Sequence, residues 1–317
     1  VYKRQILEIV SSSEKAVDGE INESEEGIII LDQTPFYAES GGQVGDTGQI
    51  KCHESIFEVQ DTQKKGDHYL HLGFMKSGKL TLKDEVSAEI DSKERKRIKS
   101  NHSGTHLLHA ALREVLGGHV EQKGSLVDQS KLRFDFTHNK SIETEEIAKI
   151  ENLINEQILL NSETVTEILP IDEAIERGAI AFFGDKYGDE VRVLNIGDNF
   201  SVELCGGTHV NMTGEIELLK ITSESSVSAG IRRIEAVTGE AANHLLDHLE
   251  HIYSSISNEL LIDDFDTREG IEALEYIRFL ENEMSVFAKL LNCSQDQVLT
   301  KIIQMKEENI TISNKLE

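Results

Sequence analysis

The segment NHSGTHLLH, residues 101–109, decides how the rest of this sequence is interpreted. It contains His102 and His106 four residues apart, and the apolar residues around them recur at helical spacing. Side chains four positions apart lie one above the other on one helix face, so the two imidazoles can coordinate one metal ion. A glycine pair beginning at Gly117 ends the pattern. The sequence therefore predicts a helix from Ser92 to the residue before that pair.

A second pattern of metal ligands lies further along the chain. The segment CGGTH places Cys205 and His209 four residues apart on a loop that two glycines make pliable. One cysteine and three histidines suit the preference of zinc for nitrogen and sulfur. We therefore predict that His102, His106, Cys205 and His209 bind one zinc ion per chain. A closed site of four protein ligands is also compatible with a structural zinc that only pins the loop to the helix.

The residues around the histidine pair exclude two classes of zinc enzyme. A metalloprotease helix needs a glutamate directly after its first histidine as general base, and Ser103 occupies that position. The sequence also lacks the His-x-Glu and Pro-Cys-x-x-Cys signature of zinc deaminases. Peptide hydrolysis and base deamination are therefore not the chemistry that this pattern predicts.

The fold class predicted from the flanking sequence is α+β, in three parts. Residues 1–91 contain short aliphatic segments separated by Gly and Asp turn signals, and indicate a small antiparallel, barrel-like β domain. Residues 92–239 mix helix and strand patterns and indicate an α+β domain that contains the zinc ligands. Residues 240–317 carry leucines and isoleucines at helical spacing, which indicates a helical linker or coiled-coil arm. Within the middle part, a second helix is predicted at 141–160 and strands at 131–136, 163–169, 190–194, 215–223 and 231–237.

The composition limits the setting of the protein. No apolar run approaches the roughly 18–20 residues that cross a bilayer, so no membrane association is expected. Three scattered cysteines are a poor disulfide framework and favour a reducing, cytoplasmic compartment. The net charge of −26 argues against a nucleic-acid partner, but a basic run at residues 93–99 leads directly into the first histidine pair. The chain begins at Val1 without a methionine, so we expect an excerpt of a longer protein.

Four sequence blocks together resemble a known family. The chain is similar to the editing region of alanyl-tRNA synthetase and to the free-standing AlaX deacylases that share this region. The resemblance spans roughly residues 27–240, in the order of the family. The family commonly has Thr-Ala where this chain has Ser103 and Gly104, and neither position is a ligand. The blocks are TPFYAESGGQ (34–43) with Asp46 and Gly48, NHSGTHLLH (101–109), LCGGTHV (204–210) and GIRRIE (230–235).

The resemblance implies an activity and roles for particular residues. The family's parent enzyme ligates alanine to tRNA(Ala) with ATP, and its editing region hydrolyses serine or glycine wrongly esterified there. Gln122 matches a position that lines the editing pocket, and Thr34 matches one associated with the serine hydroxyl. These two residues and Cys205 are therefore the predicted catalytic residues. The family's zinc ligands match His102, His106, Cys205 and His209 one by one.

Serine editing sets a physical requirement on the pocket. A pocket that only excludes large groups cannot admit serine and reject the smaller alanine, so it needs a hydrogen-bond partner for the serine hydroxyl. Thr34 or Gln122 could supply that partner, although a turn threonine and a solvated glutamine explain them equally well. Zinc is expected to orient the substrate next to a water, and backbone N–H groups near 206–207 or 41–42 could face the oxyanion.

The expected partner is the acceptor end of tRNA(Ala). Lys93, Arg97, Arg232 and Arg233 are candidate contacts to its phosphates, although a solvated helix face explains them as well. The ligation half of the parent enzyme is absent, because neither class II arginine motifs nor an ATP site is recognisable. Two alternatives stay open, a free-standing AlaX-type deacylase and a non-catalytic, zinc-stabilised tRNA-binding module. The helical arm is a candidate for oligomerisation in the full-length protein.

Overall fold

The computed structural model describes residues 2–11, 19–180, 188–260 and 272–316. The chain divides into two compact units, Val1–Gly239 and Glu240–Glu317. The first unit contains the predicted β domain and the predicted zinc-containing domain together. The division predicted between residues 91 and 92 stays a prediction.

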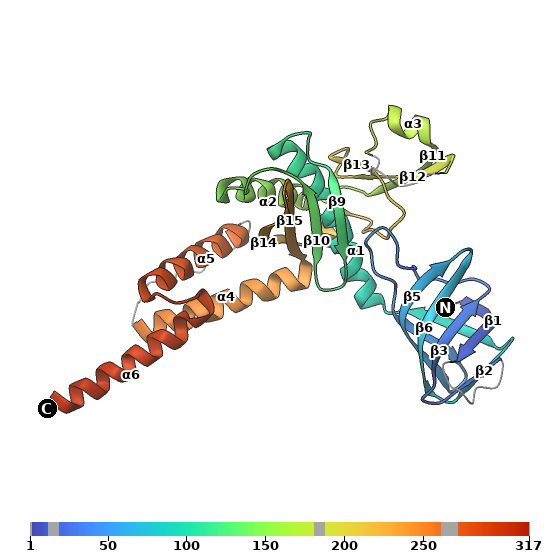
Figure 1. Ribbon diagram of the computed structural model, residues 1–317, viewed down its shortest axis with the longest axis horizontal. Coiled ribbons are helices and arrows are strands. Elements are labelled where there is room, and N and C mark those ends of the chain that lie inside the picture. The colour runs from blue at the N-terminus through green and yellow to red at the C-terminus, as the bar shows by residue number, and fades with distance from the viewer. Residues whose placement is uncertain (1, 12–18, 181–187, 261–271, 317) are drawn as a thin grey trace. The chain divides into compact units, whose positions relative to one another are not determined.

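The first part of unit 1 is a closed antiparallel barrel (Figure 1). Its interior is filled by fully buried side chains such as Ile6, Ile29, Phe57 and Met75. The barrel-like fold predicted for this part of the chain is therefore confirmed. A short ribbon of β2 (Glu20–Asn22) and β7 (Lys79–Thr81) accompanies it. In order around the barrel, the strands are β1 (Tyr2–Ser11), β3 (Glu26–Leu31), β6 (His68–Ser77), β5 (Ser55–Lys65), β4 (Gly48–Cys52) and β8 (Glu85–Ile90).

Helix α1 (Ser92–Leu116) follows the last barrel strand and has the predicted limits. It begins at Ser92 because the Asp91 side chain accepts hydrogen bonds from the backbone N–H groups of Lys93 and Glu94. It ends before Gly117, which adopts a φ of 115°. The middle of α1 is buried on nearly every side, including the whole segment from Ser100 to His109. The histidine pair is thus placed in the interior of the unit.

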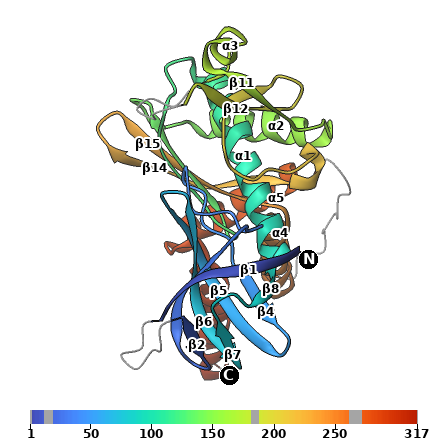
Figure 2. The ribbon, with the colours of Figure 1, turned by 90° about the vertical axis from the view of Figure 1, so that its right-hand side faces the viewer.

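Helix α1 and helix α2 (Thr144–Leu159) contact each other and a four-stranded antiparallel sheet (Figure 2). One continuous core joins them, with Leu108 of α1, Ile154 of α2 and Phe134 of the sheet all fully buried. This packing fixes the face of α1 that carries His102 and His106. In order, the strands of the sheet are β14 (Leu219–Ser228), β15 (Ile231–Thr238), β10 (Leu132–Thr137) and β9 (Gln122–Val127).

A three-stranded sheet and one short helix complete unit 1. Strand β11 (Val165–Pro170) lies at its edge, where a proline is tolerated, and helix α3 (Ile171–Glu176) follows it directly. Strands β12 (Glu190–Ile196) and β13 (Ser201–Leu204) pair antiparallel, and β13 ends directly before the CGGTH segment. The strand predicted from residue 215 is wrong at its start. A 3₁₀ turn, η1 (Thr213–Ile216), occupies that position, and β14 begins at Leu219.

Unit 2 is helical, as predicted. It consists of α4 (Gly239–Leu260, which begins at the last residue of unit 1), α5 (Glu272–Leu291), the 3₁₀ turn η2 (Gln295–Gln297) and α6 (Val298–Leu316). Ile256, Met284 and Val298 form its buried core. Among the residues that the structure describes, none of the helices combines the length and the apolar character that a membrane span requires.

Candidate metal centre

The structure brings the two predicted ligand pairs to one point. His102 and His106 lie on α1, and Cys205 and His209 lie on the loop after β13. One ligand atom from each residue lies within 4.8 Å of all the others. The Cys205 Sγ is 3.5 Å from the His102 Nε2 and 3.3 Å from the His209 Nε2. Segments far apart in sequence therefore form a single cluster that could hold a metal ion.

Each of the three histidines is held at its Nδ1 atom by an oxygen from a different element. The His102 Nδ1 is 2.7 Å from the Gln43 Oε1, and the His106 Nδ1 is 2.8 Å from the Glu203 Oε2. The His209 Nδ1 is 3.2 Å from the Ser103 Oγ. When the oxygen accepts, it fixes the proton on Nδ1 and leaves Nε2 as a lone-pair donor. The three imidazoles are thus oriented as metal ligands commonly are.

The electrostatics of the cluster favour a bound cation. Burial alone would raise the pKa of the Cys205 thiol, but His102 and His106 hold it well below its ordinary value. Burial would likewise lower the pKa of His106, but Glu203 and Cys205 raise it to about 10. The cluster therefore contains two buried anions, the Cys205 thiolate and the Glu203 carboxylate, in contact with the imidazoles. A divalent ion would neutralise both charges, and its soft and borderline donors, one sulfur and three nitrogens, suit zinc.

A buried unpartnered atom points to the same conclusion. The His106 side chain is only 4% exposed, and its Nε2 has no hydrogen-bond partner. Buried polar atoms are nearly always paired, so one that is not requires an explanation. A metal bond at Nε2 explains it, because this atom belongs to the ligand cluster. The residues of this chain therefore fit a metal ion.

The glycine-rich loop between β3 and β4 (residues 32–47), the barrel loop, lies against edge strand β9. The Val44 N–H donates to the Val127 carbonyl at 3.0 Å, and the Val127 N–H donates to the Gly42 carbonyl at 2.7 Å. Gly42 has a φ of 87°, and a Cβ there would lie 2.5 Å from the Ser125 carbonyl oxygen. Only glycine permits this close approach. The pairing delivers Gln43, which is fully buried, to the metal centre.

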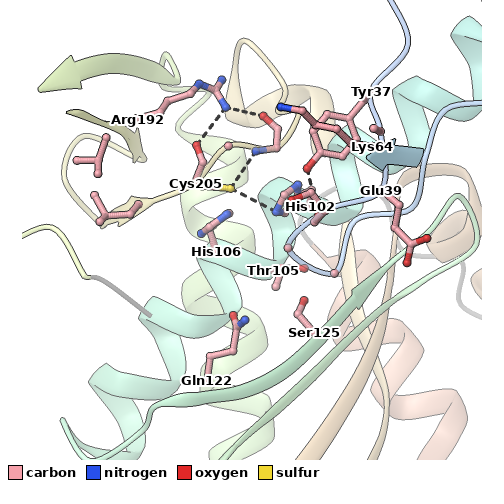
Figure 3. Close-up of a pocket in the computed structure, with 18 of the residues that line it drawn as sticks. Tyr37, Glu39, Lys64, His102, Thr105, His106, Gln122, Ser125, Arg192 and Cys205 are labelled. Carbon is pink, nitrogen blue, oxygen red and sulfur yellow. Dashed lines mark hydrogen bonds between the residues drawn. The ribbon is translucent and has the colours of Figure 1, made fainter. Parts of the chain in front are cut away.

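The cluster forms part of the wall of a pocket of about 1060 Å³. Figure 3 shows that the barrel loop and hairpin, α1, β9 and the CGGTH loop all contribute to it. His102, His106 and Cys205 line it together with Gln122 and Arg192. A pocket of this size fits a small-molecule ligand beside the metal ligands. The metal centre is thus accessible from one side.

The two predicted catalytic residues outside the cluster have different positions. Gln122, at the start of β9, lines the pocket. Thr34 does not line it. The Thr34 Oγ1 is 2.7 Å from the Nε2 of His71, which is buried in the barrel, and it accepts a hydrogen bond from the Phe36 N–H. The structure therefore places Gln122, but not Thr34, in the wall of the pocket that the metal ligands also line.

The predicted phosphate contacts also differ in their surroundings. Arg232 forms an ion pair with Glu224, and Arg233 forms one with Asp135. Lys93 and Arg97 lie exposed on the first turns of α1. Arg232 and Arg233 are therefore engaged by carboxylates, and Lys93 and Arg97 are exposed.

Four residues of the centre were given no role by the sequence interpretation. They are Gln43, Ser103, Glu203 and Arg192, and the first three lie within or beside the quoted blocks. Glu203 is 1% exposed, and it holds both His106 and His109, whose Nδ1 atoms are 2.8 and 3.0 Å from its oxygens. Its position two residues before Cys205 was the available signal. Nothing in the sequence around Arg192 marks it.

Comparison with known proteins identifies the family. Residues 2–94 match the family described as tRNA synthetases class II (A). Residues 191–235 match the threonyl and alanyl tRNA synthetase second additional domain, and this match includes Cys205 and His209. The alanine–tRNA ligase of Saccharophagus degradans is 48% identical over 90% of this chain. The chain belongs to the alanyl-tRNA synthetase family.

Other alanyl-tRNA synthetases give the same picture. The enzyme of Dechloromonas aromatica is 46% identical over 96% of the chain, and that of Coxiella burnetii is 48% identical over 94%. The chain covers 33% of the length of the Saccharophagus degradans relative, 35% of the Dechloromonas aromatica relative and 34% of the Coxiella burnetii relative. It therefore matches a region that makes up about one third of the length of these alanyl-tRNA synthetases.

Proposed function

We propose that this chain hydrolyses the ester bond of Ser-tRNA(Ala) or Gly-tRNA(Ala), with one zinc ion held by His102, His106, Cys205 and His209. Ligation of alanine with ATP belongs to the parts of the relatives that lie outside this region. The proposal places the protein in the cytoplasm, where its substrate is made. Its partner is the acceptor end of tRNA(Ala).

One observation carries this proposal. Three imidazoles with their Nδ1 atoms already engaged and one thiolate lie close together, and His102, His106 and Cys205 line a pocket that Gln122 also lines. A purely structural zinc would have no need of an adjoining pocket large enough for a ligand. The comparisons support a substrate class, because the matched domain is named for threonyl and alanyl synthetases.

The protein's own residues would bind and orient the ester. A zinc ion held there would supply a Lewis acid that polarises a carbonyl and lowers the pKa of a nearby water. Gln43, Ser103 and Glu203 keep the histidine rings in place, so the site does not reorganise during the reaction. The backbone N–H groups of the CGGTH loop or of the barrel loop would face the developing oxyanion.

Gln122 is the favoured partner for the serine hydroxyl. It lines the pocket, and its amide can both donate and accept a hydrogen bond. Alanine would leave this amide without a partner, and this loss would disfavour alanyl-tRNA relative to seryl-tRNA. Glycine has no hydroxyl either, so this contact selects serine and plays no part in the hydrolysis of Gly-tRNA(Ala). Thr34 is less favoured because His71 and the Phe36 backbone already occupy its hydroxyl.

Contacts to RNA phosphates are assigned to the exposed cations near the helix start, Lys93 and Arg97. Arg232 and Arg233, which pair with Glu224 and Asp135, are kept as further candidates for such contacts. Oligomerisation through the helical unit remains part of the proposal for the full-length protein.

The test is a deacylation assay with Ser-, Gly- and Ala-tRNA(Ala), run with and without a chelator and with zinc added back. We expect hydrolysis of the first two esters, loss with chelator and recovery with zinc. Cys205→Ala should abolish hydrolysis. Cys293→Ala is the matched cysteine control, because Cys293 packs in the separate core of unit 2 and should leave the rate unchanged.

Two results would count against the proposal. Full activity of Cys205→Ala would show that the cluster is not the reaction centre. Zinc-dependent binding of tRNA without hydrolysis of any ester would instead identify a non-catalytic, zinc-stabilised RNA-binding module.

A further inference from the structure

The loop that carries Cys205 and His209 needs an external support. It runs from the end of β13 at Leu204 to the 3₁₀ turn at Thr213 and contains two adjacent glycines. Gly206 is exposed, and a Cβ built on it would meet nothing within 4 Å. Glycine backbones lose much conformational freedom on ordering. The two ligands can share one ion only if other groups restrict this loop.

Arg192 of β12 restricts the first half of the loop. Its Nη1 donates hydrogen bonds to the Cys205 carbonyl at 3.1 Å and to the Gly207 carbonyl at 2.6 Å. Its own backbone carbonyl accepts the Cys205 N–H at 3.0 Å. Figure 3 shows the guanidinium beside the loop with both side-chain bonds dashed. Two carbonyls that lie two residues apart converge on one nitrogen, so the backbone curls around the guanidinium.

Gln43 holds the same loop from the opposite side. In a trans peptide the C=O and N–H groups point in opposite directions. The Gly207 carbonyl points at Arg192, and the Thr208 N–H of the same peptide plane donates to the Gln43 Oε1 at 2.9 Å. That oxygen is also the partner of the His102 Nδ1. Arg192 therefore contacts the Cys205 backbone directly. It is linked to His102 through the Gly207–Thr208 peptide group and the Gln43 side-chain amide.

We propose that Arg192 is a positioning residue for the metal centre, which holds the Cys205–Gly207 turn in its metal-binding shape. This inference rests on the metal binding proposed above. The direction of the change in zinc affinity when Arg192 is removed distinguishes a positioning role from an effect of its charge alone. A guanidinium beside the site repels a divalent cation, so an arginine that contributed only charge would weaken metal binding, and its removal would strengthen it. A positioning role gives the opposite result.

The experiment compares the parent chain with Arg192→Ala, Arg192→Lys and a control, Arg177→Ala. Zinc affinity is measured by competition with a chromophoric chelator, and the ligand geometry by the absorption spectrum of the cobalt-substituted protein. Arg192→Ala should bind zinc about 10–100-fold more weakly, with an altered cobalt spectrum. Arg192→Lys should be intermediate, because it keeps the charge but not the planar fork. Arg177, an exposed residue that pairs with Glu167 and Glu173, should have no effect.

A rescue measurement removes the ambiguity of a damaged fold. Guanidinium ion added to Arg192→Ala, below denaturing concentrations, should restore part of the affinity and the parent spectrum, whereas added ammonium should not. Unchanged or tighter zinc binding by Arg192→Ala, or a lysine variant equal to the parent, would overturn the inference. If Arg192→Ala fails to fold, the lysine variant decides in the same way. A parent chain that binds no metal would instead contradict the proposed function itself.

Discussion

The side chains of the metal centre are packed so closely that one added methyl group would displace a ligand. The two loop glycines, Gly206 and Gly207, allow a test of this packing. A Cβ at Gly207 would lie 2.1 Å from the His102 Cε1, whereas one at Gly206 would meet no atom within 4 Å. Gly207→Ala should therefore displace a ligand ring and abolish zinc binding in an equilibrium titration. Gly206→Ala, its neighbour, should bind zinc as the parent does. Equal affinity of the two variants would contradict the arrangement described here.

A histidine in the barrel gives a prediction for pH. His71 is fully buried, and burial lowers its pKa from the ordinary 6.5 to about 4, although the Ile29 carbonyl opposes the shift. The unfolded chain therefore binds this proton at a higher pH than the folded chain. His71 favours the folded state fully above about pH 6.5, and this contribution is lost as the pH falls towards 4, by about 3 kcal/mol in total.

The measurement is urea unfolding at several pH values between 7 and 4. In His71→Gln the loss of stability over this window should be smaller than in the parent. His68→Gln changes an exposed histidine of the same strand and should keep the parent's pH profile. Parallel profiles for the parent and His71→Gln would show that the ring does not titrate as described.

The metal ligands could be predicted at this scale because their spacing is local. His102 and His106 share one helix face, and Cys205 and His209 share one loop. The residues that orient them could not be predicted, because they come from distant segments. Gln43 is 59 positions from His102, and Glu203 is 97 positions from His106. Thr34 was favoured by resemblance alone, and its hydroxyl is occupied inside the barrel.

Between elements, one ion pair joins the barrel loop to the start of α1. The Arg95 guanidinium donates to both carboxylate oxygens of Asp46, with 2.7 Å between Nε and Oδ1. Asp46 is 2% exposed and also accepts the Tyr37 N–H. Asp46→Ala would leave a half-buried cation without its partner and should lower the free energy of unfolding by about 3–5 kcal/mol.

Chemical denaturation of unit 1 checks this value. Glu85→Ala removes the exposed pair with Lys3, whose side chains are 87% and 70% exposed, and should change stability by less than about 1 kcal/mol. Similar losses in the two variants would mean that the Asp46 pair contributes no more than a surface pair.

The accuracy of the predicted elements depended on where their signals lie. Helix α1 carries its own stop at Gly117, and its limits were predicted correctly. The strand predicted at 215–223 exists but begins later than predicted, at Leu219, because the Glu215 carboxylate accepts the N–H groups of Asn211 and Met212 and holds a tight turn before it. Strand β9 was missed because its sequence, QKGSLV, is polar and contains glycine, and it is an edge strand that the barrel loop covers.

At the scale of the whole molecule, an acidic chain has basic side chains around its pocket. Lys64 and Lys123 line the pocket from the barrel hairpin and from β9, and the Lys64 Nζ lies 5.4 Å from the Tyr69 ring centroid. Such a combination of cations and an aromatic ring suits a single-stranded RNA end. Lys64→Gln or Lys123→Gln should reduce the slope of log affinity against log salt by about 0.7.

Fluorescence anisotropy with a 3′-seryl-amide RNA ending in CCA, titrated at several salt concentrations, measures this slope. Lys79→Gln is the matched control, because Lys79 lies on the same barrel, pairs with Glu20 and does not line the pocket. If all three variants show the parent slope, RNA phosphates do not contact the pocket lysines.

The two hydrogen bonds between the Gln43 side-chain amide and Thr208 span 165 positions of the chain. At a ribosomal speed of about 5–20 residues per second, the glutamine emerges roughly 8–33 seconds before the threonine. During this interval the glutamine lacks its partner, and until Cys205 is made at most two of the four ligands exist. The proposed zinc ion can meet all four ligands only after His209 has been synthesised, and strands β14 and β15 of the same unit are made later still, so the ion can be captured before the core of the unit is complete.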